Sequence, residues 1–452
     1  MEIELMFSLI SIFFYCIFTY MIVKVHKLKN GLTIIACEYF RFNSLYFDLA
    51  VKVGSRYENE KNNGIAHLVE HLAAAQSSAH KPVEQWIKDD LAHDFSAYTL
   101  QERTNFEFSA HKNDLKPVLK LLSELVYARG VVIDKRDLET EKKIILEELL
   151  ENENEPDFYY NTKVRNICFS DCSLKLNILG ISHNIMKFCL DDVRRFVNDY
   201  YRPENMILTV AGSFKIETLV KLADKYFKFS RESMAQRVES LKKERFRISS
   251  AYIEPKGGIN FINRSASQNY LGYYATVQNS NADELIKREF FVEFLDQYLS
   301  HYLRAKIFCY SVGADINTFR EFSSFSVESS FQPDKTENFY ALFQQILKRF
   351  RKTLDFGTLK HLKNNKLKRL ELDKDYPREA ANLTSWFALV FGTEKIITHT
   401  YQQCMIKSVE LKDIFNFYDQ MFRVRPGTVI IGGKVSPTQK QQLKKLWSNW
   451  KV

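Results

Sequence analysis

The chain has few cysteines for its length, and they are not arranged in pairs. Its 452 residues contain seven, at positions 16, 37, 168, 172, 189, 309 and 404. An odd, scattered set does not make a disulfide framework, and Cys168 and Cys172 have no second pair with which to form a four-cysteine zinc site. We therefore expect reduced cysteines and a reducing compartment.

The sequence also lacks the features of a nucleic-acid-binding protein. Its net charge is +9, but aromatic residues are not interleaved with the basic ones and no nucleic-acid-binding motif is present. The most basic segment, residues 348–374, is typical of a solvated helix face. Contact with anionic lipid or acidic peptides is the alternative. We expect no nucleic-acid partner.

One long apolar run lies near the N-terminus, and it lacks the flanks of a cleavable signal peptide. Residues 5–23 carry no charge and are long enough to span a bilayer. Two acidic residues precede the run, and no small-residue cleavage site follows it. We interpret residues 1–24 as a segment that anchors the chain in a membrane, and the basic residues after it predict that the bulk of the chain is cytoplasmic. A start at Met21, giving a soluble cytoplasmic protein, and a buried N-terminal helix are the alternatives.

The length of the chain and a repeated strand pattern predict two halves. A chain of 452 residues is too long for one compact core. Residues 202–212 read as a buried strand that closes the first half, and residues 425–433 repeat its character, which indicates an internal duplication. The polar residues 230–258 are the expected linker between halves at 25–229 and 259–452.

The residues that point to chemistry are His67, Glu70 and His71, in the stretch HLVEH. The Ala- and Leu-rich flank favours a helix, on which positions four apart share one face. His67 and His71 can therefore each present a ring nitrogen to one metal ion, while Glu70 can reach a water on that metal without binding it. Imidazole is a good zinc ligand, and a catalytic zinc typically takes three protein ligands. The alternative is a chance pair of surface histidines.

H-x-x-E-H is the inverted zinc motif, and the surrounding sequence resembles the M16 family of metallopeptidases. Members of that family have a ligating glutamate further along the chain, in a segment like E-x-E-x-x-V-I-L-x-E. Residues 139–149, ETEKKIILEEL, resemble that segment. The resemblance implies that Glu148 is the third ligand of one Zn²⁺ per chain. It also implies that Glu141 is an auxiliary acid of the reaction.

Two further segments resemble substrate-binding parts of the family. FSAYT is similar to the family's N-A-Y-T strand, whose edge pairs with the substrate backbone, so Ser96 and Ala97 are expected to bind substrate. Ser96 replaces the usual Asn, and its shorter side chain is expected to weaken this positioning. LRAKIFCYSV resembles R-E-K-x-G-L-x-Y-S-V, although it is one residue shorter and lacks the Gly. Arg304 and Tyr310 match the family's Arg and Tyr that reach the reacting carbonyl, and an ordinary helix end followed by a strand is the alternative.

The resemblance implies an α+β fold of the LuxS/M16 type, with two homologous halves of antiparallel-rich sheet packed with helices. The second half lacks H-x-x-E-H and is expected to bind substrate. The expected activity is that of a zinc metalloendopeptidase acting on short or unfolded peptides, for maturation or turnover, with Glu70 moving a proton from water to the leaving amine. The alternative is a non-catalytic or partner-dependent subunit of a heterodimeric peptidase. Both a homodimer and a heterodimer therefore remain open.

Overall fold

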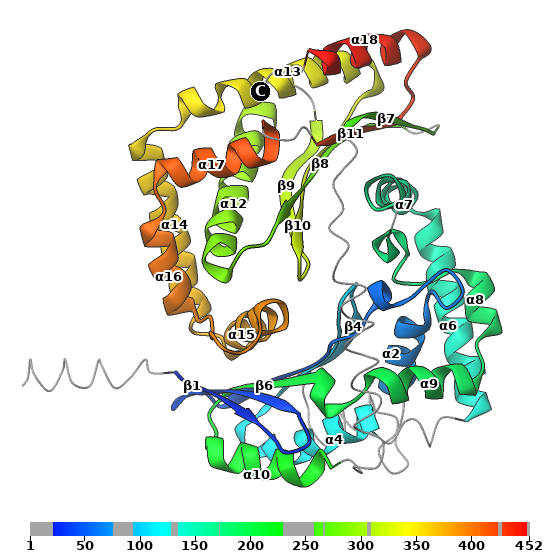
Figure 1. Ribbon diagram of the computed structural model, residues 1–452, viewed down its shortest axis with the longest axis vertical. Helices are drawn as coiled ribbons and strands as arrows, with labels where there is room; N and C mark the ends of the chain where they lie inside the picture. The colour runs from blue at the N-terminus through cyan, green and yellow to red at the C-terminus, as the bar shows by residue number, and fades with distance from the viewer. Residues whose placement is uncertain are drawn as a thin grey trace, which may run out of the picture. The chain divides into compact units, whose positions relative to one another are not determined.

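The computed structural model describes residues 21–75, 94–127, 134–170, 172–228, 257–264, 267–304, 309–423 and 427–449. Contacts group the chain into two compact units (Figure 1). The first lies within residues 1–146, 178–242 and 372–398, and the second within residues 147–177, 243–371 and 399–452. Each unit is therefore assembled from separate stretches, and not from one continuous half of the sequence.

A six-stranded sheet, in the order β1-β2-β6-β3-β5-β4, forms the centre of the first unit. Its strands are β1 (Ile22–Lys27), β2 (Thr33–Glu38), β3 (Ser44–Val51), β4 (Phe95–Thr99), β5 (Thr104–His111) and β6 (Met206–Gly212). β2 and β6 run parallel, whereas the other neighbours are antiparallel. Among the described strands, β4 has a neighbour on one side only.

The first unit's helices cover both faces of this sheet. They are α2 (Ile65–Ala75), α4 (Leu115–Tyr127), α8 (Ser182–Lys187), α9 (Leu190–Tyr200), α10 (Ile216–Tyr226), α15 (Pro377–Phe391) and the first part of α6 (Lys135–Asn154), whose residues from Glu147 on are grouped with the second unit. α4 and α10 lie below the sheet in Figure 1, whereas α15 lies above it. Because successive strand residues point to opposite faces, β3 places Phe47 on one side and its neighbours Tyr46 and Asp48 on the α15 side.

α15 comes from far along the chain, yet it completes the core of the first unit. Its small residues Ala381 and Ala388 are buried against Ile35, Cys37 and Ile207. Small side chains let the helix backbone approach the strands closely. The interface also has a polar part, in which the guanidinium of Arg378 on α15 lies 3.7 Å from the buried carboxylate of Glu107 on β5. Amphipathic packing and one ion pair therefore fix α15 on the sheet.

The second unit repeats the topology of the first. Its five strands follow the order β7-β11-β8-β10-β9, which matches β2-β6-β3-β5-β4 position by position. They are β7 (Gly258–Asn263), β8 (Asn269–Gln278), β9 (Cys309–Thr318), β10 (Phe322–Phe331) and β11 (Thr428–Gly433). β7 and β11 are parallel, as are β2 and β6, and the other pairs are antiparallel. The predicted internal duplication is confirmed, with β6 and β11 in equivalent places.

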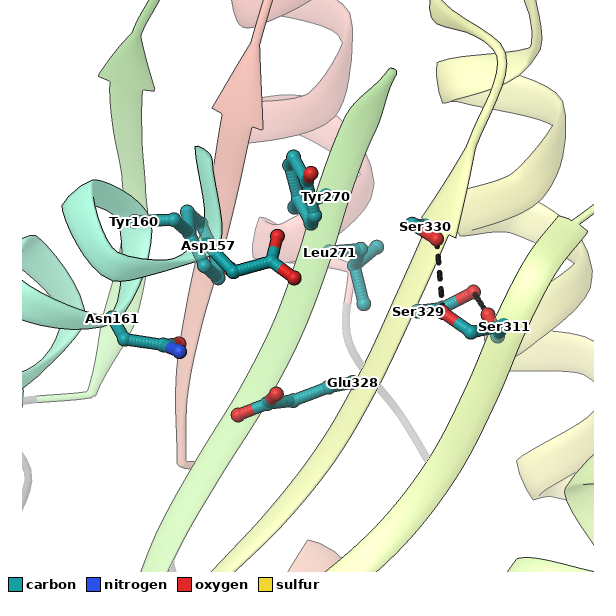
Figure 2. Close-up of a pocket in the computed structure, with 9 residues that line it drawn as sticks. All are labelled: Asp157, Tyr160, Asn161, Tyr270, Leu271, Ser311, Glu328, Ser329 and Ser330. Atoms are coloured by element: carbon teal, nitrogen blue, oxygen red, sulfur yellow. Dashed lines mark hydrogen bonds between the residues drawn. The ribbon is translucent and has the colours of Figure 1, made fainter. Parts of the chain in front are cut away.

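Helix α7 (Pro156–Cys168) packs on one face of the second sheet. Tyr160 and Val164 of α7 are buried against Ile430 of β11 and Tyr274 of β8. A cavity of about 130 Å³ lies beside this contact (Figure 2). Its lining includes two carboxylates and three serines, namely Asp157, Glu328, Ser311, Ser329 and Ser330. Burial raises the pKa of Glu328.

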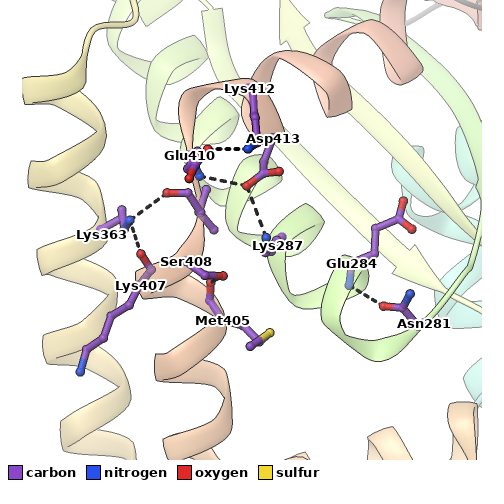
Figure 3. Close-up of polar contacts among 11 residues, drawn as sticks. Asn281, Glu284, Lys287, Lys363, Met405, Lys407, Ser408, Glu410, Lys412 and Asp413 are labelled. Carbon is purple, nitrogen blue, oxygen red and sulfur yellow. Dashed lines mark hydrogen bonds and ion pairs between the residues drawn. The ribbon is translucent and has the colours of Figure 1, made fainter.

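The remaining helices of the second unit are α12 (Ala282–Arg304), α13 (Thr336–Thr353), α14 (Phe356–Asp373), α16 (His399–Ser408), α17 (Leu411–Phe422) and α18 (Pro437–Ser448). Lysine side chains form hydrogen bonds and ion pairs between several of these helices (Figure 3). Lys363 of α14 donates to the carbonyl oxygens of Lys407 at 2.6 Å and Val409 at 2.8 Å, at the C-terminal end of α16. A cation there complements the helix dipole. Lys366 of the same basic segment pairs with Glu293 at 2.5 Å. Residues 348–374 are therefore partly structural and not only a solvated face.

The N-terminal expectation is corrected. Residues 1–20 lie outside the described residues, but Ile22 and Val23, the end of the expected anchor, belong to β1. They pair with Glu38 and Cys37 of β2. Their extended backbone bonds to a sheet strand, so the run does not continue as a helix through residue 23. In the part of the chain that the structure describes, no helix is long and apolar enough to cross a membrane. The expectation of a membrane-associated chain is thus overturned.

The expected linker, residues 230–258, lies outside the described residues except for its last two.

Candidate metal centre

Helix α2 carries the H-x-x-E-H motif, and a buried carboxylate fixes its first turn. Glu58 accepts hydrogen bonds from the backbone N–H groups of Gly64 at 2.9 Å and Ala66 at 2.8 Å. The Asn63 side chain donates a third, at 2.8 Å. The first N–H groups of a helix have no partner within the helix, so Glu58 acts as its cap. Burial raises the pKa of Glu58 to about 7, and these hydrogen bonds oppose the rise.

The start of α2 also depends on two glycines in close contact. Gly64 has φ = +103°, a conformation that residues with a side chain rarely adopt. A Cβ at Gly64 would lie 2.9 Å from the Cα of Gly180, and one at Gly180 would lie 2.5 Å from the Cα of Gly64. The two backbones are therefore in direct contact at the start of the helix that carries the H-x-x-E-H motif.

Three side chains come together in the arrangement that the sequence predicts for the metal ligands. His67, His71 and Glu148 each offer one ligand atom, and these atoms all lie within 4.8 Å of one another. α2 places both histidines on one face. α6 is a single continuous helix in which Glu148 follows Glu141 by about two turns, so both carboxylates lie on the same side. Two imidazole nitrogens and one carboxylate oxygen make a donor set that a catalytic zinc takes.

Glu141 holds one of the histidines. Its Oε2 lies 3.2 Å from Nδ1 of His71. When Nδ1–H donates to this carboxylate, the lone pair of Nε2 is left for a metal. The other histidine is kept neutral, because burial, and secondarily the nearby His71, lowers the pKa of His67 to about 3. Neutral imidazoles are the form that binds metal, so the residues fit a zinc ion.

Glu70 lies on α2 beside the candidate ligand His67. Its Oε2 is 3.8 Å from Nε2 of His67. The same oxygen accepts a hydrogen bond from Oγ1 of Thr99, at 3.3 Å. Glu70 and Thr99 are only 6% and 7% exposed. The carboxylate therefore lies next to the candidate ligand His67, where the sequence predicts a proton acceptor.

The expected substrate-binding residues of the first unit lie on an edge strand that contacts α2. Ser96 and Ala97 are in β4, which pairs with β5 and has no second neighbour among the described strands. Ser96 is exposed and Ala97 half-buried. Such an edge offers backbone N–H and C=O groups to another extended chain. A peptide bound there would lie on the strand that also holds Thr99 against Glu70.

Arg304 and Tyr310 belong to the second unit. Arg304 is the last residue of α12, and Tyr310 lies on β9 with 56% of its surface exposed. Residues 305–308 between them lie outside the described part of the chain. The expected strand after the helix is present, and the role of this pair in catalysis stays a prediction.

Sequence reasoning missed two residues that the structure places at the site. Glu58 lies outside the spacing of a helix capping box, so no local pattern marks it as the cap of α2. Thr99 lies in the FSAYT strand, but its bond to Glu70 joins residues 29 positions apart. Thr99 is the last residue of the strand that resembles the family's substrate-binding strand. This position is the signal in the sequence that could have suggested a role for Thr99 at the site.

The fold and the donor set of His67, His71 and Glu148 match what the sequence predicts for a zinc metallopeptidase, and the comparisons specify the family. The family model "Insulinase (Peptidase family M16)" matches residues 43–181, and "Peptidase M16 inactive domain" matches residues 187–366. The chain belongs to peptidase family M16.

Relatives agree with this assignment. An "Uncharacterized zinc protease" from Rickettsia bellii is 27% identical over 419 residues, which is 90% of this chain and 97% of the relative. The mitochondrial-processing peptidase subunit beta of Saccharomyces cerevisiae is 33% identical over 207 residues, 45% of this chain and 44% of that protein. The crystal structure of a protease from Helicobacter pylori has a TM-score of 0.77 at 17% identity, covering 92% of this chain and 100% of that one. The last similarity concerns the fold alone.

Proposed function

We propose that this chain is a zinc-dependent metalloendopeptidase that hydrolyses peptide bonds in short or unfolded peptides. The observation that carries the proposal is the convergence of His67, His71 and Glu148 within 4.8 Å, with Glu70 beside His67. The name "zinc protease" of the Rickettsia bellii relative supports the same metal and reaction class.

Each residue has a distinct part in the proposed reaction. His67, His71 and Glu148 would hold a zinc ion, which would supply a Lewis acid for the scissile carbonyl. Glu70 takes a proton from the attacking water and passes it to the leaving amine. Glu141 keeps His71 in the tautomer that presents Nε2.

The substrate class follows from the edge strand. A peptide that adds to β4 must be extended, so its backbone can bond to residues around Ser96 and Ala97. Most of the backbone of a folded protein is already bonded within its own helices and sheets, whereas an unfolded peptide can extend along β4. Short or unfolded peptides, in maturation or turnover, are therefore the proposed substrates.

The test measures zinc content and cleavage of an unstructured peptide by the purified chain. We expect one zinc per chain, cleavage that stops on chelation, and recovery when zinc is restored. Glu70→Gln should keep the zinc and lose cleavage by at least about 100-fold. Glu147→Gln, at an exposed position of α6, is the matched control and should leave both unchanged. Full activity of Glu70→Gln would remove Glu70 from the mechanism.

A second candidate is a subunit that needs a partner for activity. It is favoured by Ser96 at the position where the resemblance expects Asn, and by the word "subunit" in the name of the Saccharomyces cerevisiae relative. Zinc binding without cleavage by the chain alone, followed by cleavage when a second M16-type chain is added, would support a heterodimer. Activity of the isolated chain at all concentrations would exclude this candidate.

A further inference from the structure

One threonine hydroxyl connects the proposed proton acceptor to the strand on which substrate is proposed to bind. Oγ1 of Thr99 lies 3.3 Å from Oε2 of Glu70 and 3.5 Å from Oγ1 of Thr104. Thr104 faces Thr99 across the β4–β5 ladder. The single proton of the Thr99 hydroxyl therefore has two acceptors within reach.

The neighbouring hydrogen bonds favour Glu70 as the acceptor. Thr104 donates its own proton to the carbonyl oxygen of Val53 at 3.0 Å. Thr104 is thus a neutral acceptor, whereas Glu70 is a carboxylate, and bonds to an ionised acceptor are roughly twice as strong. The Thr99 proton is therefore directed at Glu70, and Thr104 lies beside Thr99 as its cross-strand neighbour.

The hydroxyl of Tyr201, which is buried near Glu70, stays neutral. Burial raises the pKa of Tyr201, and the nearby negative charge of Glu70 adds to the rise. Tyr201 therefore introduces no competing charge. The carboxylate of Glu70 lies among buried neutral groups on this side, where the direction of one hydrogen bond has a large effect on its orientation.

We propose that Thr99 is a positioning residue that orients the Glu70 carboxylate and couples it to β4. The inference rests on the proposed peptidase function. Proton transfer requires the acceptor oxygen to be within hydrogen-bond reach of the water, and small misplacements reduce the rate strongly. Because Thr99 and Ala97 are two residues apart on the same strand, a peptide that extends the sheet at β4 contacts the element that holds the proton acceptor.

The test compares three threonine variants. Thr99→Val keeps the shape and removes the hydroxyl, whereas Thr99→Ser keeps the hydroxyl and removes the methyl group. Thr209→Val is the matched control, because Thr209 is a fully buried threonine of β6 in the same sheet. For an unstructured peptide, we expect Thr99→Val to lower kcat about 10-fold or more, with KM and zinc content unchanged. Thr99→Ser should retain most of kcat, and Thr209→Val should have the wild-type kcat.

Three outcomes would overturn the inference. These are a wild-type kcat for Thr99→Val, an equal loss for Thr99→Val and Thr99→Ser, or a loss of zinc from Thr99→Val. Crystal structures of the zinc-loaded variants give a readout that does not depend on activity. We expect Glu70 to take a new orientation in Thr99→Val and to keep its orientation in Thr99→Ser. If that difference is seen but the wild-type chain cleaves nothing, the positioning role stands and the proposed function fails.

Discussion

Glu141 and His71 lie 3.2 Å apart, carboxylate oxygen to Nδ1, although they are separated by 70 positions in the chain. Glu141→Gln should therefore weaken zinc binding about 10–100-fold, because the amide holds the imidazole less firmly and leaves it less basic. A competition titration against a zinc chelator measures the change. Unchanged affinity would mean that Glu141 does not orient the ligand.

Zinc should also stabilise the folded chain, because a ligand that binds only the folded state raises its stability by mass action. We expect the midpoint of thermal unfolding to rise with added zinc for the wild-type chain and for Glu147→Gln. Glu148→Gln should lose most of this rise, since the amide removes the negative charge and one strong donor atom from the set. A rise in Glu148→Gln equal to that of the wild type would contradict its role as a ligand.

Gly64→Ala should destabilise the fold, by about 2 kcal/mol or more, because both its backbone conformation and the space around it exclude a side chain. The Cβ would lie 2.9 Å from the Cα of Gly180. Gly392→Ala is the control, since Gly392 also has a positive φ but would place its Cβ in open space. The Gly392 backbone, with φ = 86° and ψ = −179°, is itself strained for alanine, so this variant should lose about 1–3 kcal/mol, and Gly64→Ala should lose more because the steric contact adds to the strain. Denaturant unfolding of the two variants measures the difference, and equal losses would argue against the steric contact.

The buried carboxyl of Asp48 should make stability depend on pH. Asp48 lies on β3, faces α15 and is 2% exposed, and burial raises its pKa to about 6 from the ordinary aspartate value of about 3.9. The folded state therefore binds a proton more tightly than the unfolded state. The stability that this tighter proton binding contributes is fully present below about pH 4 and is lost as the pH rises through 6.

The asparagine in Asp48→Asn cannot ionise, so the unfolding free energy of this variant should not fall with pH for this reason. Between pH 4 and 7 the unfolding free energy of the wild type should fall relative to that of Asp48→Asn, by on the order of 2 kcal/mol. Urea unfolding of both proteins at the two pH values gives the difference, in which titrating groups that do not interact with Asp48 cancel. A difference that does not change with pH would show that Asp48 ionises alike in the folded and unfolded states.

The sequence predicted the features of this protein that depend on local spacing. A four-residue separation on a helix is enough to place His67 and His71 on one face, whatever surrounds them. The duplication was visible in two similar closing strands, β6 and β11, because equivalent positions in equivalent sheets require similar apolar runs. Glu148 was found by resemblance, since no local pattern links it to α2.

Long-range contacts were not predictable in the same way. The apolar face of α15 indicates that the helix is buried, but it does not say that it is buried on the sheet of the first unit. The apolar run before residue 24 could be interpreted as a membrane anchor because hydropathy does not distinguish a spanning helix from a run that ends in a strand. Pairing of Ile22 and Val23 with β2 shows that the end of the run is a strand, and this pairing depends on residues further along the chain.

The origin of α15 has a consequence for synthesis. A ribosome completes the six strands of the first sheet at Gly212, whereas the helix that covers one face spans Pro377–Phe391. At an elongation rate of about 5–20 residues per second, α15 is synthesised on the order of ten seconds after β6, and this face of the sheet stays uncovered until then. During this interval Ile35, Cys37, Ile207 and Ala211 present an apolar surface to the solvent. Nascent chains should therefore bind chaperones that recognise exposed apolar sheet, and a chain that terminates before Pro377 should aggregate.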